Sequence, residues 1–216
     1  MNTQAQKLRE LLASKSIATA VGVYDGFTAK IVEQAGFDAA LISGAAVATS
    51  LQGLPDNGMI TLTEMADAAK RISSCVSIPV IADADNGYGN ALNVRRTVQE
   101  FELGGCAALQ LEDQASPKKC GHMDGKEVIP TIEHCRKIEM AAATRNEMLI
   151  LARTDAATVT GIDDAINRVN EYAKAGADFV IVDAPRTVED LKKIGERVQA
   201  PVMVNLVEGG KTPYLS

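Results

Sequence analysis

Cysteine is sparse in this chain and shows no paired spacing: there are four residues among 216 and no Cys-x-x-Cys pair. Cys75, Cys106 and Cys135 lie in apolar or helical contexts, where a free thiol serves as a small hydrophobic side chain. Unpaired spacing of this kind is typical of reducing compartments, and we expect a cytoplasmic protein. Cys120 is placed differently, between a lysine and a glycine.

Long apolar runs and an excess of basic residues are also missing. No stretch approaches the ~20 apolar residues that a membrane-spanning helix needs, and residues 1–14 are polar rather than signal-like. The formal net charge of -6 disfavours nucleic acid as a partner. The sequence has no GxGxxG or Walker pattern and therefore predicts no nucleotide site. We expect a soluble protein without a membrane or nucleic-acid partner.

What the chain does contain is an alternation of short apolar runs and longer amphipathic segments. The runs lack the in-and-out alternation of a half-solvated sheet, which predicts buried parallel strands. They are Ala18–Tyr24, Ala39–Ser43, Val80–Ala84, Ala107–Leu111, Leu149–Arg153, Phe179–Asp183 and Val202–Asn205. Helices are predicted at Phe27–Glu33, Thr63–Ile72, Ala91–Leu103, Ile132–Thr144, Ile162–Ala173 and Val188–Arg197, with Thr61 or Thr63 as one cap. No linker divides the chain, which favours a single domain over residues 1–216.

This order of elements predicts an α/β protein of the (β/α)8 TIM-barrel type. Polar residues follow at least five of the strands, and the active site of such barrels lies at the carboxyl ends of the strands. Only seven strands are predicted, whereas such barrels typically have about 250 residues. We therefore expect an incomplete barrel that lacks the eighth strand. An open, doubly wound parallel sheet is the structural alternative.

Carboxylates follow two neighbouring strands. Asp83 and Asp85 are one residue apart after the third strand, and Glu112 follows the fourth. In an extended strand Asp83 and Asp85 would point the same way, and three oxygen ligands suit Mg²⁺, with Mn²⁺ as a substitute. The simpler alternative is that the aspartates cap a helix while Glu112 pairs with a surface lysine. Polar residues at the other strand ends favour the metal site.

A second cluster surrounds Cys120 along the chain. Lys118, Lys119 and His122 are its neighbours, and cations beside a thiol favour a nucleophile or an acid–base group. The alternative is an inert core thiol, but the residues next to Cys120 are not apolar. His134, in contrast, is a lone helical histidine, for which we expect a surface position.

Further polar side chains follow the later strands. Arg153 can clamp a substrate carboxylate in bidentate fashion, or else form a structural ion pair with Asp155 or Asp183. Asn205 offers a donor and an acceptor at the seventh strand end. The turn that contains Thr212 either supplies amides and a hydroxyl to an anion or is an ordinary turn.

Together these motifs resemble the isocitrate lyase/phosphoenolpyruvate mutase superfamily, and most of all its methylisocitrate lyase and 2,3-dimethylmalate lyase-like members. The resemblance covers nearly the whole chain, with several motifs in the same order. The motifs are Ser43-Gly44-Ala45, Gly53-Leu54-Pro55-Asp56, Asp83-Ala84-Asp85-Asn86-Gly87-Tyr88-Gly89, Leu111-Glu112-Asp113-Gln114, Lys118 to His122, Ala152-Arg153-Thr154-Asp155-Ala156, and Asn205.

The resemblance implies an enzyme in which Mg²⁺ and several side chains grip a small di- or tricarboxylate. The implied metal residues are Asp56, Asp83, Asp85 and Glu112, and the implied substrate-binding residues are Ser43, Gly44, Ala45, Gly121, Arg153, Asp183, Asn205 and Thr212. In the family's carbon–carbon lyases, the cysteine matching Cys120 protonates the carbanion-like product from a mobile loop. Lys118 and His122 would bind the distal carboxylate or tune that thiol. The carbon–phosphorus mutases lack this cysteine, so its presence favours a lyase.

The implied reaction is a retro-aldol cleavage. A base removes the C2 hydroxyl proton, the C2–C3 bond breaks, and a 2-oxo acid such as pyruvate leaves a carboxylate enolate for Cys120 to protonate. The sequence does not identify the base, for which Tyr24 is one candidate. Leu41 stands where isocitrate and methylisocitrate lyases carry tyrosine, and Asp183 where they carry glutamate. Both differences favour a smaller substituted malate, such as 2,3-dimethylmalate, over a tricarboxylate of the 2-methylisocitrate type.

Three alternatives stay open at this point. An oxaloacetate hydrolase or decarboxylase and a phosphonopyruvate- or carboxyphosphonate-type mutase would use the same pocket. An inactive fragment that retains a carboxylate-binding pocket is the third. The resemblance also implies C-terminal helices after an eighth strand, which we expect to be missing from residues 1–216, and a homo-oligomer, usually a tetramer.

Overall fold

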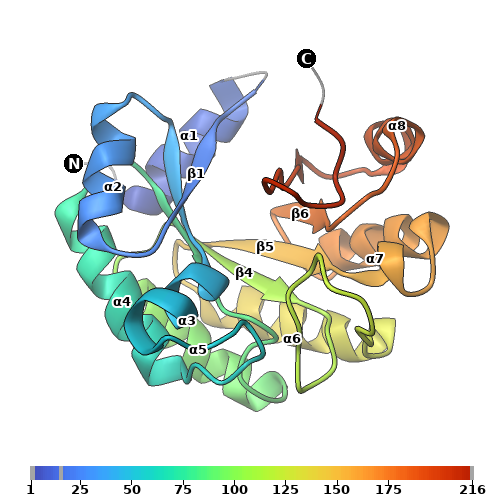
Figure 1. Ribbon diagram of the computed structural model, residues 1–216. Coiled ribbons are helices and arrows are strands. Elements are labelled where there is room, and N and C mark those ends of the chain that lie inside the picture. The colour runs from blue at the N-terminus through green and yellow to red at the C-terminus, as the bar shows by residue number, and fades with distance from the viewer. Residues whose placement is uncertain (1–2, 15–16, 215–216) are drawn as a thin grey trace.

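The computed structural model describes residues 3–14 and 17–214, and its strands form one parallel sheet that curls into an incomplete barrel (Figure 1). The strands are β1 (Ala20–Val23), β2 (Ala39–Ile42), β3 (Val80–Asp83), β4 (Ala108–Glu112), β5 (Leu149–Thr154), β6 (Phe179–Val182) and β7 (Val202–Met203). Each strand pairs in parallel with the one before it in the chain. This singly wound order confirms the incomplete barrel, because a doubly wound sheet would reverse its strand order partway.

Apart from α1, the described helices lie between consecutive strands in the chain, and most of them cover the outer face of the sheet (Figure 1). They are α1 (Gln4–Ser14), α2 (Gly26–Gln34), α3 (Gly44–Gln52), α4 (Leu62–Cys75), α5 (Ala91–Leu103), α6 (Thr131–Thr144), the short 3-10 helix η1 (Ala156–Thr158), α7 (Ile162–Lys174) and α8 (Val188–Arg197). Thr61 caps α4 in a reciprocal box with Glu64, as one of the two sequence alternatives expected. The sequence prediction missed α1, α3 and η1. No described helix is long and apolar enough to cross a membrane.

Helix α1 packs at the amino-terminal end of the barrel. Its buried Ala5 and Leu8 belong to an apolar cluster that also contains Leu149 and Phe179, the first residues of β5 and β6. Lys7 donates a hydrogen bond from α1 to the carbonyl of Ser77, just before β3, at 2.8 Å. One end of the barrel is therefore apolar and covered, which leaves the carboxyl ends of the strands for polar groups.

The middle strands are buried on both faces. Outward-facing side chains such as Ile150 and Val180 pack beneath the helices, while Leu151 and Ile181 face the barrel interior with α1. This two-sided burial explains why the strand runs are continuously apolar in the sequence. Strand β7 is shorter than the predicted run, so Asn205 lies two residues beyond its end.

Candidate active site

Asp83 and Asp85 meet at the carboxyl end of β3, but not through strand geometry. Asp83 is the last strand residue, whereas Asp85 has a left-handed backbone with φ of 47°, so the expectation that both extend from one strand is wrong. The chain turns sharply there, yet both carboxylates converge on Gly44. A Cβ at Gly44 would lie 2.9 Å from Asp83 Oδ2 and 3.4 Å from Asp85 Oδ1. Glycine at this position therefore lets α3 begin directly against the two carboxylates.

Lys118 reaches into this carboxylate cluster rather than towards the thiol. Its ammonium donates a hydrogen bond to Asp56 and lies 2.7 Å from Asp85 Oδ1, and the residue is only 5% exposed. Burial alone would lower the pKa of Lys118, but the surrounding carboxylates, Asp83 first, outweigh burial and raise it. Lys118 therefore stays charged and ties the loop after β4 to the end of β3.

Two carboxyl groups in the cluster retain unused acceptor capacity. Asp85 Oδ1 and Glu112 Oε1 are buried and form no hydrogen bond within the described residues, although Asp85 is ion-paired to Lys118. Burial, and then the neighbouring charge of Asp83, raise the pKa of Asp85 to about 6. Burial likewise raises the pKa of Glu112 despite the nearby Arg153. The cluster is therefore short of positive charge.

This donor set fits a hard divalent cation. Among residues 3–14 and 17–214, no three His, Cys, Asp or Glu side chains already form a metal cage. The available groups are nevertheless carboxylate oxygens with free lone pairs, which is the chemistry that Mg²⁺ prefers while keeping several waters. Asp83 is already oriented by three donors, namely the amides of Gly44 and Asp85 and the side chain of Gln110. Gln110, a polar residue inside an apolar strand, was missed from the sequence.

Arg153 occupies the centre of a second buried network. Its Nε and Nη2 donate to the two carboxylate oxygens of Asp155, both at 3.0 Å, and Nη2 also donates to Asp183 at 3.0 Å. Glu112 lies 3.5 Å from Nε and so joins the two networks. Asn205 donates to the other oxygen of Asp183 at 3.1 Å. Arg153 thus forms ion pairs with both Asp155 and Asp183, which is the structural alternative of the sequence analysis, and its role as a substrate clamp stays a prediction.

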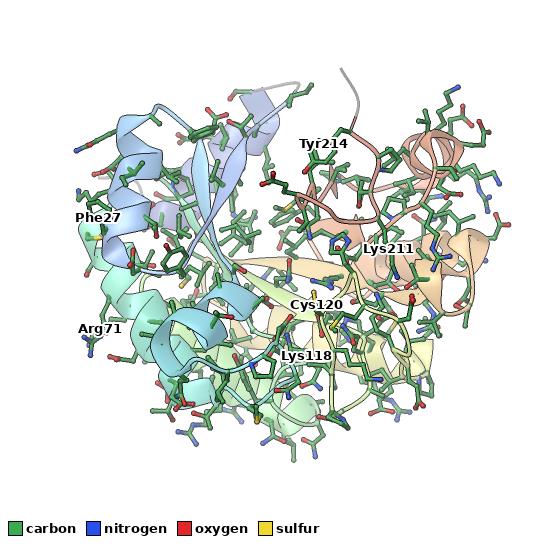
Figure 2. The ribbon with its side chains drawn as sticks, in the orientation of Figure 1. Phe27, Arg71, Lys118, Cys120, Lys211 and Tyr214 are labelled. Carbon is green, nitrogen blue, oxygen red and sulfur yellow. The ribbon has the colours of Figure 1, made fainter. Side chains whose placement is uncertain are left out.

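The loop between β4 and α6 folds over this network. Figure 2 shows Cys120 and Lys118 on it, near the carboxyl ends of the strands. A Cβ at Gly121 would overlap Asp183 Oδ2 and Arg153 Nη2, so the backbone is pressed directly onto the ion pair. Only a residue without a side chain fits there, which explains the glycine beside Cys120.

His122 connects the same loop to the C-terminal segment. Its Nδ1 accepts a hydrogen bond from the amide of Lys211 at 3.0 Å, so a neutral ring carries its proton on Nε2. That Nε2 is buried without a hydrogen-bond partner in the described residues, as is the hydroxyl of Thr212. Burial, acting against the charge of Asp183, lowers the pKa of His122. Two uncommitted polar groups therefore lie on this side of the site.

The lysines next to Cys120 in sequence bind groups other than its thiol. Lys118 is held by Asp56 and Asp85, and Lys119 donates to the carbonyl of Gly125 at 2.7 Å. Within the described residues, no hydrogen bond involves the Cys120 sulfur. Both lysines are therefore engaged by other groups, and the influence of Lys118, Lys119 and His122 on the thiol stays a prediction.

His134 also departs from its expected surface position. It is fully buried on α6, with its ring 4.6 Å from that of Tyr172 in an edge-on contact. Burial, and secondarily the charge of Lys137, lower the pKa of His134 to about 3. The ring is therefore a neutral core group, on the helix face that packs against α7.

Ser43 begins α3, and its hydroxyl accepts a hydrogen bond from the amide of Ala46 at 3.2 Å. Gly44 and Ala45 form the first turn of this helix, beside Asp83. Tyr24 lies just after β1 and is partly exposed. The structure thus places residues 43–45 against the carboxylate cluster, and their binding role stays a prediction.

A parallel β/α barrel with acidic and basic side chains gathered at its strand carboxyl ends defines a class of small-molecule enzymes. The sequence model for phosphoenolpyruvate phosphomutase matches residues 8–215, and the chain belongs to this family.

Two relatives are named for small carboxylate substrates. The chain is 47% identical over 217 residues to 2,3-dimethylmalate lyase from Eubacterium barkeri, covering 100% of this chain and 75% of the relative. It is 46% identical over 209 residues to 2-methylisocitrate lyase from Aeropyrum pernix, covering 97% of this chain and 68% of the relative. The relatives therefore extend beyond the region that they share with this chain.

Solved structures agree with this relationship. A 2,3-dimethylmalate lyase superposes with a TM-score of 0.95 at 36% identity, over 100% of this chain and 74% of that one. An oxaloacetate acetylhydrolase bound to 3,3-difluorooxalacetate gives 0.95 at 34% identity, over 99% and 75%. A phosphonopyruvate hydrolase solved with oxalate and Mg²⁺ gives 0.84 at 31% identity, over 94% and 71%. Lyases and hydrolases therefore share this barrel.

Proposed function

We propose that the chain is an Mg²⁺-dependent carbon–carbon lyase that cleaves a substituted 2-hydroxy dicarboxylate to a 2-oxo acid and a carboxylate. The observation that carries the proposal is the loop of Cys120 folded over the buried Arg153 network, in a chain 47% identical to a 2,3-dimethylmalate lyase. The proposed reaction needs a proton donor next to the departing half of the substrate. A thiol on the loop that covers the site would lie in that position.

The carboxylate cluster would hold the cation and the oxo-acid half of the substrate. Asp83, Asp85, Glu112 and Asp56 would bind Mg²⁺, directly or through water, and the buried Oε1 of Glu112, which has no hydrogen-bond partner within the described residues, supports this assignment. When bound, the cation would act as a Lewis acid on the substrate oxygens. Arg153 and the start of α3 would orient the adjoining carboxylate by hydrogen bonds.

The loop side of the site would hold the departing half. His122 offers an Nε2 proton and Thr212 offers a hydroxyl, and both are buried without partners in the described residues. These donors would bind the distal carboxylate, while Cys120 would give its proton to the carbon that leaves. Lys118 would hold the loop in place through Asp56 and Asp85.

The side chains that line the barrel favour a small substrate. Leu41 packs beside the inner apolar cluster, and the short carboxylate of Asp183 is fully engaged by Arg153 and Asn205. Neither offers a free polar group for a third substrate carboxylate. A substituted malate such as 2,3-dimethylmalate is therefore favoured over 2-methylisocitrate.

A second candidate is oxaloacetate hydrolysis, favoured by the TM-score of 0.95 with an oxaloacetate acetylhydrolase. The two candidates share the carboxylate cluster and differ in the bond that breaks. Hydrolysis would need a water molecule at the oxo carbon, whereas the lyase reaction needs the thiol proton. We further propose that the protein is cytoplasmic and forms a homo-oligomer. The resemblance to the superfamily implies a tetramer.

The test is an assay for 2-oxo acid, acetate and oxalate release from 2,3-dimethylmalate, 2-methylisocitrate, oxaloacetate and phosphonopyruvate, with Mg²⁺ and with EDTA. We expect Mg²⁺-dependent pyruvate release from 2,3-dimethylmalate. Replacement of Cys120 by serine should lower this rate by about 10²- to 10⁴-fold while oxalate still binds. Turnover indifferent to EDTA, or oxalate release from oxaloacetate alone, would contradict the lyase assignment.

A further inference from the structure

Lys126 is a buried lysine at the far end of the Cys120 loop, outside every motif that the sequence singled out. It follows Asp124-Gly125 and precedes Glu127, a composition typical of a solvated turn. Its side chain is nevertheless almost completely buried, at 1% exposure. A buried ammonium costs free energy unless it is paired and hydrogen-bonded, so its partners indicate what it holds.

The ammonium of Lys126 has two partners, one on the loop and one on the barrel. It donates a hydrogen bond to the carbonyl of Gly121, next to Cys120, and another to Asp155 Oδ1 at 2.8 Å. Asp155 is the residue that grips Arg153 through both carboxylate oxygens. One cation therefore connects the backbone beside the thiol to the carboxylate that orients Arg153.

Other contacts within the loop do not duplicate the link from Lys126 to Gly121. The base of the loop is closed by the bridge between Gln114 and Val128, and the Gln114 side chain binds both backbone groups of Lys119. These contacts fix the two ends of the loop and its first arm. Only Lys126, among the described residues, donates to the carbonyl of Gly121.

We propose that Lys126 is a positioning residue that holds Gly121, and hence the Cys120 thiol, against the Arg153–Asp155 pair. Its effect on turnover depends on the lyase reaction proposed above, whereas its effect on loop position does not. Loss of the charged hydrogen bond to Gly121 would lower the ratio of the folded-over loop to the open loop by about 10- to 100-fold.

The test measures Cys120 exposure directly, by iodoacetamide labelling followed by peptide mass spectrometry. Partly buried Cys75 serves as the internal reference. In Lys126→Met, labelling of Cys120 relative to Cys75, both of which are partly buried, should rise by about 3-fold or more, and Lys126→Arg should return most of the ratio to that of the unmutated protein. Lys7→Met is the matched control, because Lys7 also donates to a backbone carbonyl but lies at the opposite end of the barrel.

Turnover supplies a second readout. The methionine variant should lose about 10-fold or more in kcat, with a smaller change in KM, because the substrate half bound near Asp83 does not contact Lys126. If K126M does not fold, Lys126→Gln is judged by the same labelling ratio. An unchanged Cys120 ratio in a folded variant overturns the proposal. Absence of turnover in the unmutated chain, with the labelling result intact, would instead count against the lyase function.

Discussion

Glu112 and Asp113 are adjacent carboxylates at the end of β4, and both are buried, at 1% and 0% exposure. Their surroundings differ completely. Asp113 accepts hydrogen bonds from Thr154 at 2.6 Å, Tyr172 at 2.8 Å and the amide of Asp155 at 3.0 Å, and it pairs with Arg168. Glu112 faces the barrel interior, and its Oε1 accepts no hydrogen bond from any residue that the structure describes.

The comparison distinguishes a structural carboxylate, which links β5 to α7 in the barrel wall, from one that is available to a ligand. A buried polar group with all its partners fixes a structure, whereas a buried group lacking partners costs stability and is retained where function needs it. Asp113 locks the carboxyl end of β5 to α7. Glu112, one residue earlier, belongs to the cluster proposed to bind Mg²⁺.

The largest effect on stability should come from Asp113→Asn. The asparagine amide nitrogen is a donor, so it would face other donors, such as those of Thr154, Tyr172 or Arg168, where the carboxylate accepts hydrogen bonds. The free energy of unfolding should therefore fall by roughly 3–5 kcal/mol. Urea denaturation followed by circular dichroism measures the loss. A change below about 1 kcal/mol would show that Asp113 does not hold the wall together.

Gly121→Ala should leave the fold intact and damage the site. The added methyl group would overlap Arg153 and Asp183, so the loop cannot settle on them and kcat/KM should fall by about 100-fold. Steady-state kinetics on the best substrate of the panel gives the value. Gly195→Ala is the control, because a Cβ there meets no atom within 4 Å. Normal kinetics in the Gly121 variant would mean that the loop does not need this close contact.

His134 adds a pH dependence to the wall beside Tyr172. The pKa of His134 is about 3 in the folded protein, below the ordinary value of 6.5. Below pH 6.5 the ring is therefore protonated in the unfolded chain but stays neutral in the folded protein. Stability is therefore lost as pH falls, by roughly 2 kcal/mol from this group between pH 8 and pH 5. His134→Phe should remove that share of the slope when unfolding is measured at both pH values. If the free energy of unfolding depended on pH equally in both proteins, the His134 ring would have to be exposed to solvent rather than buried.

The smallest effect on stability should come from Glu112→Gln. Burial already disfavours the charged form, and the amide has nearly the same shape, so stability should change by less than about 1 kcal/mol. The same urea titration, run beside that of Asp113→Asn, gives the contrast between the two neighbours. A loss as large as that of the Asp113 variant would show that Glu112 too is structural.

Much of the fold follows from local pattern, because two-sided burial makes the strand runs continuously apolar. The prediction missed α1, although Leu8, Leu11 and Leu12 recur at helical spacing in its polar sequence. It missed α3 because Gly44 and the alanines after it lack an amphipathic pattern.

The site residues that directly follow a strand could be predicted from the sequence. Residues whose position depends on long side chains that reach across the fold could not. Asp83, Glu112 and Arg153 follow apolar runs, and the structure brings them into adjoining networks. Lys126 resembles a turn lysine, and His134 resembles a surface residue. Their burial depends on contacts with residues distant in the sequence, such as Asp155 and Tyr172, which local composition does not encode.

The central claim, that Glu112 belongs to a cation site and Asp113 does not, is tested most directly by Mg²⁺ titration calorimetry in the presence of oxalate. We expect the unmutated protein to bind Mg²⁺, and Glu112→Gln to weaken that binding by at least about 10-fold without unfolding. Glu100→Gln, on the outer surface of α5, should bind as the unmutated protein does. Equal Mg²⁺ affinity in the Glu112 variant and the unmutated protein would contradict the assignment of this carboxylate to the metal.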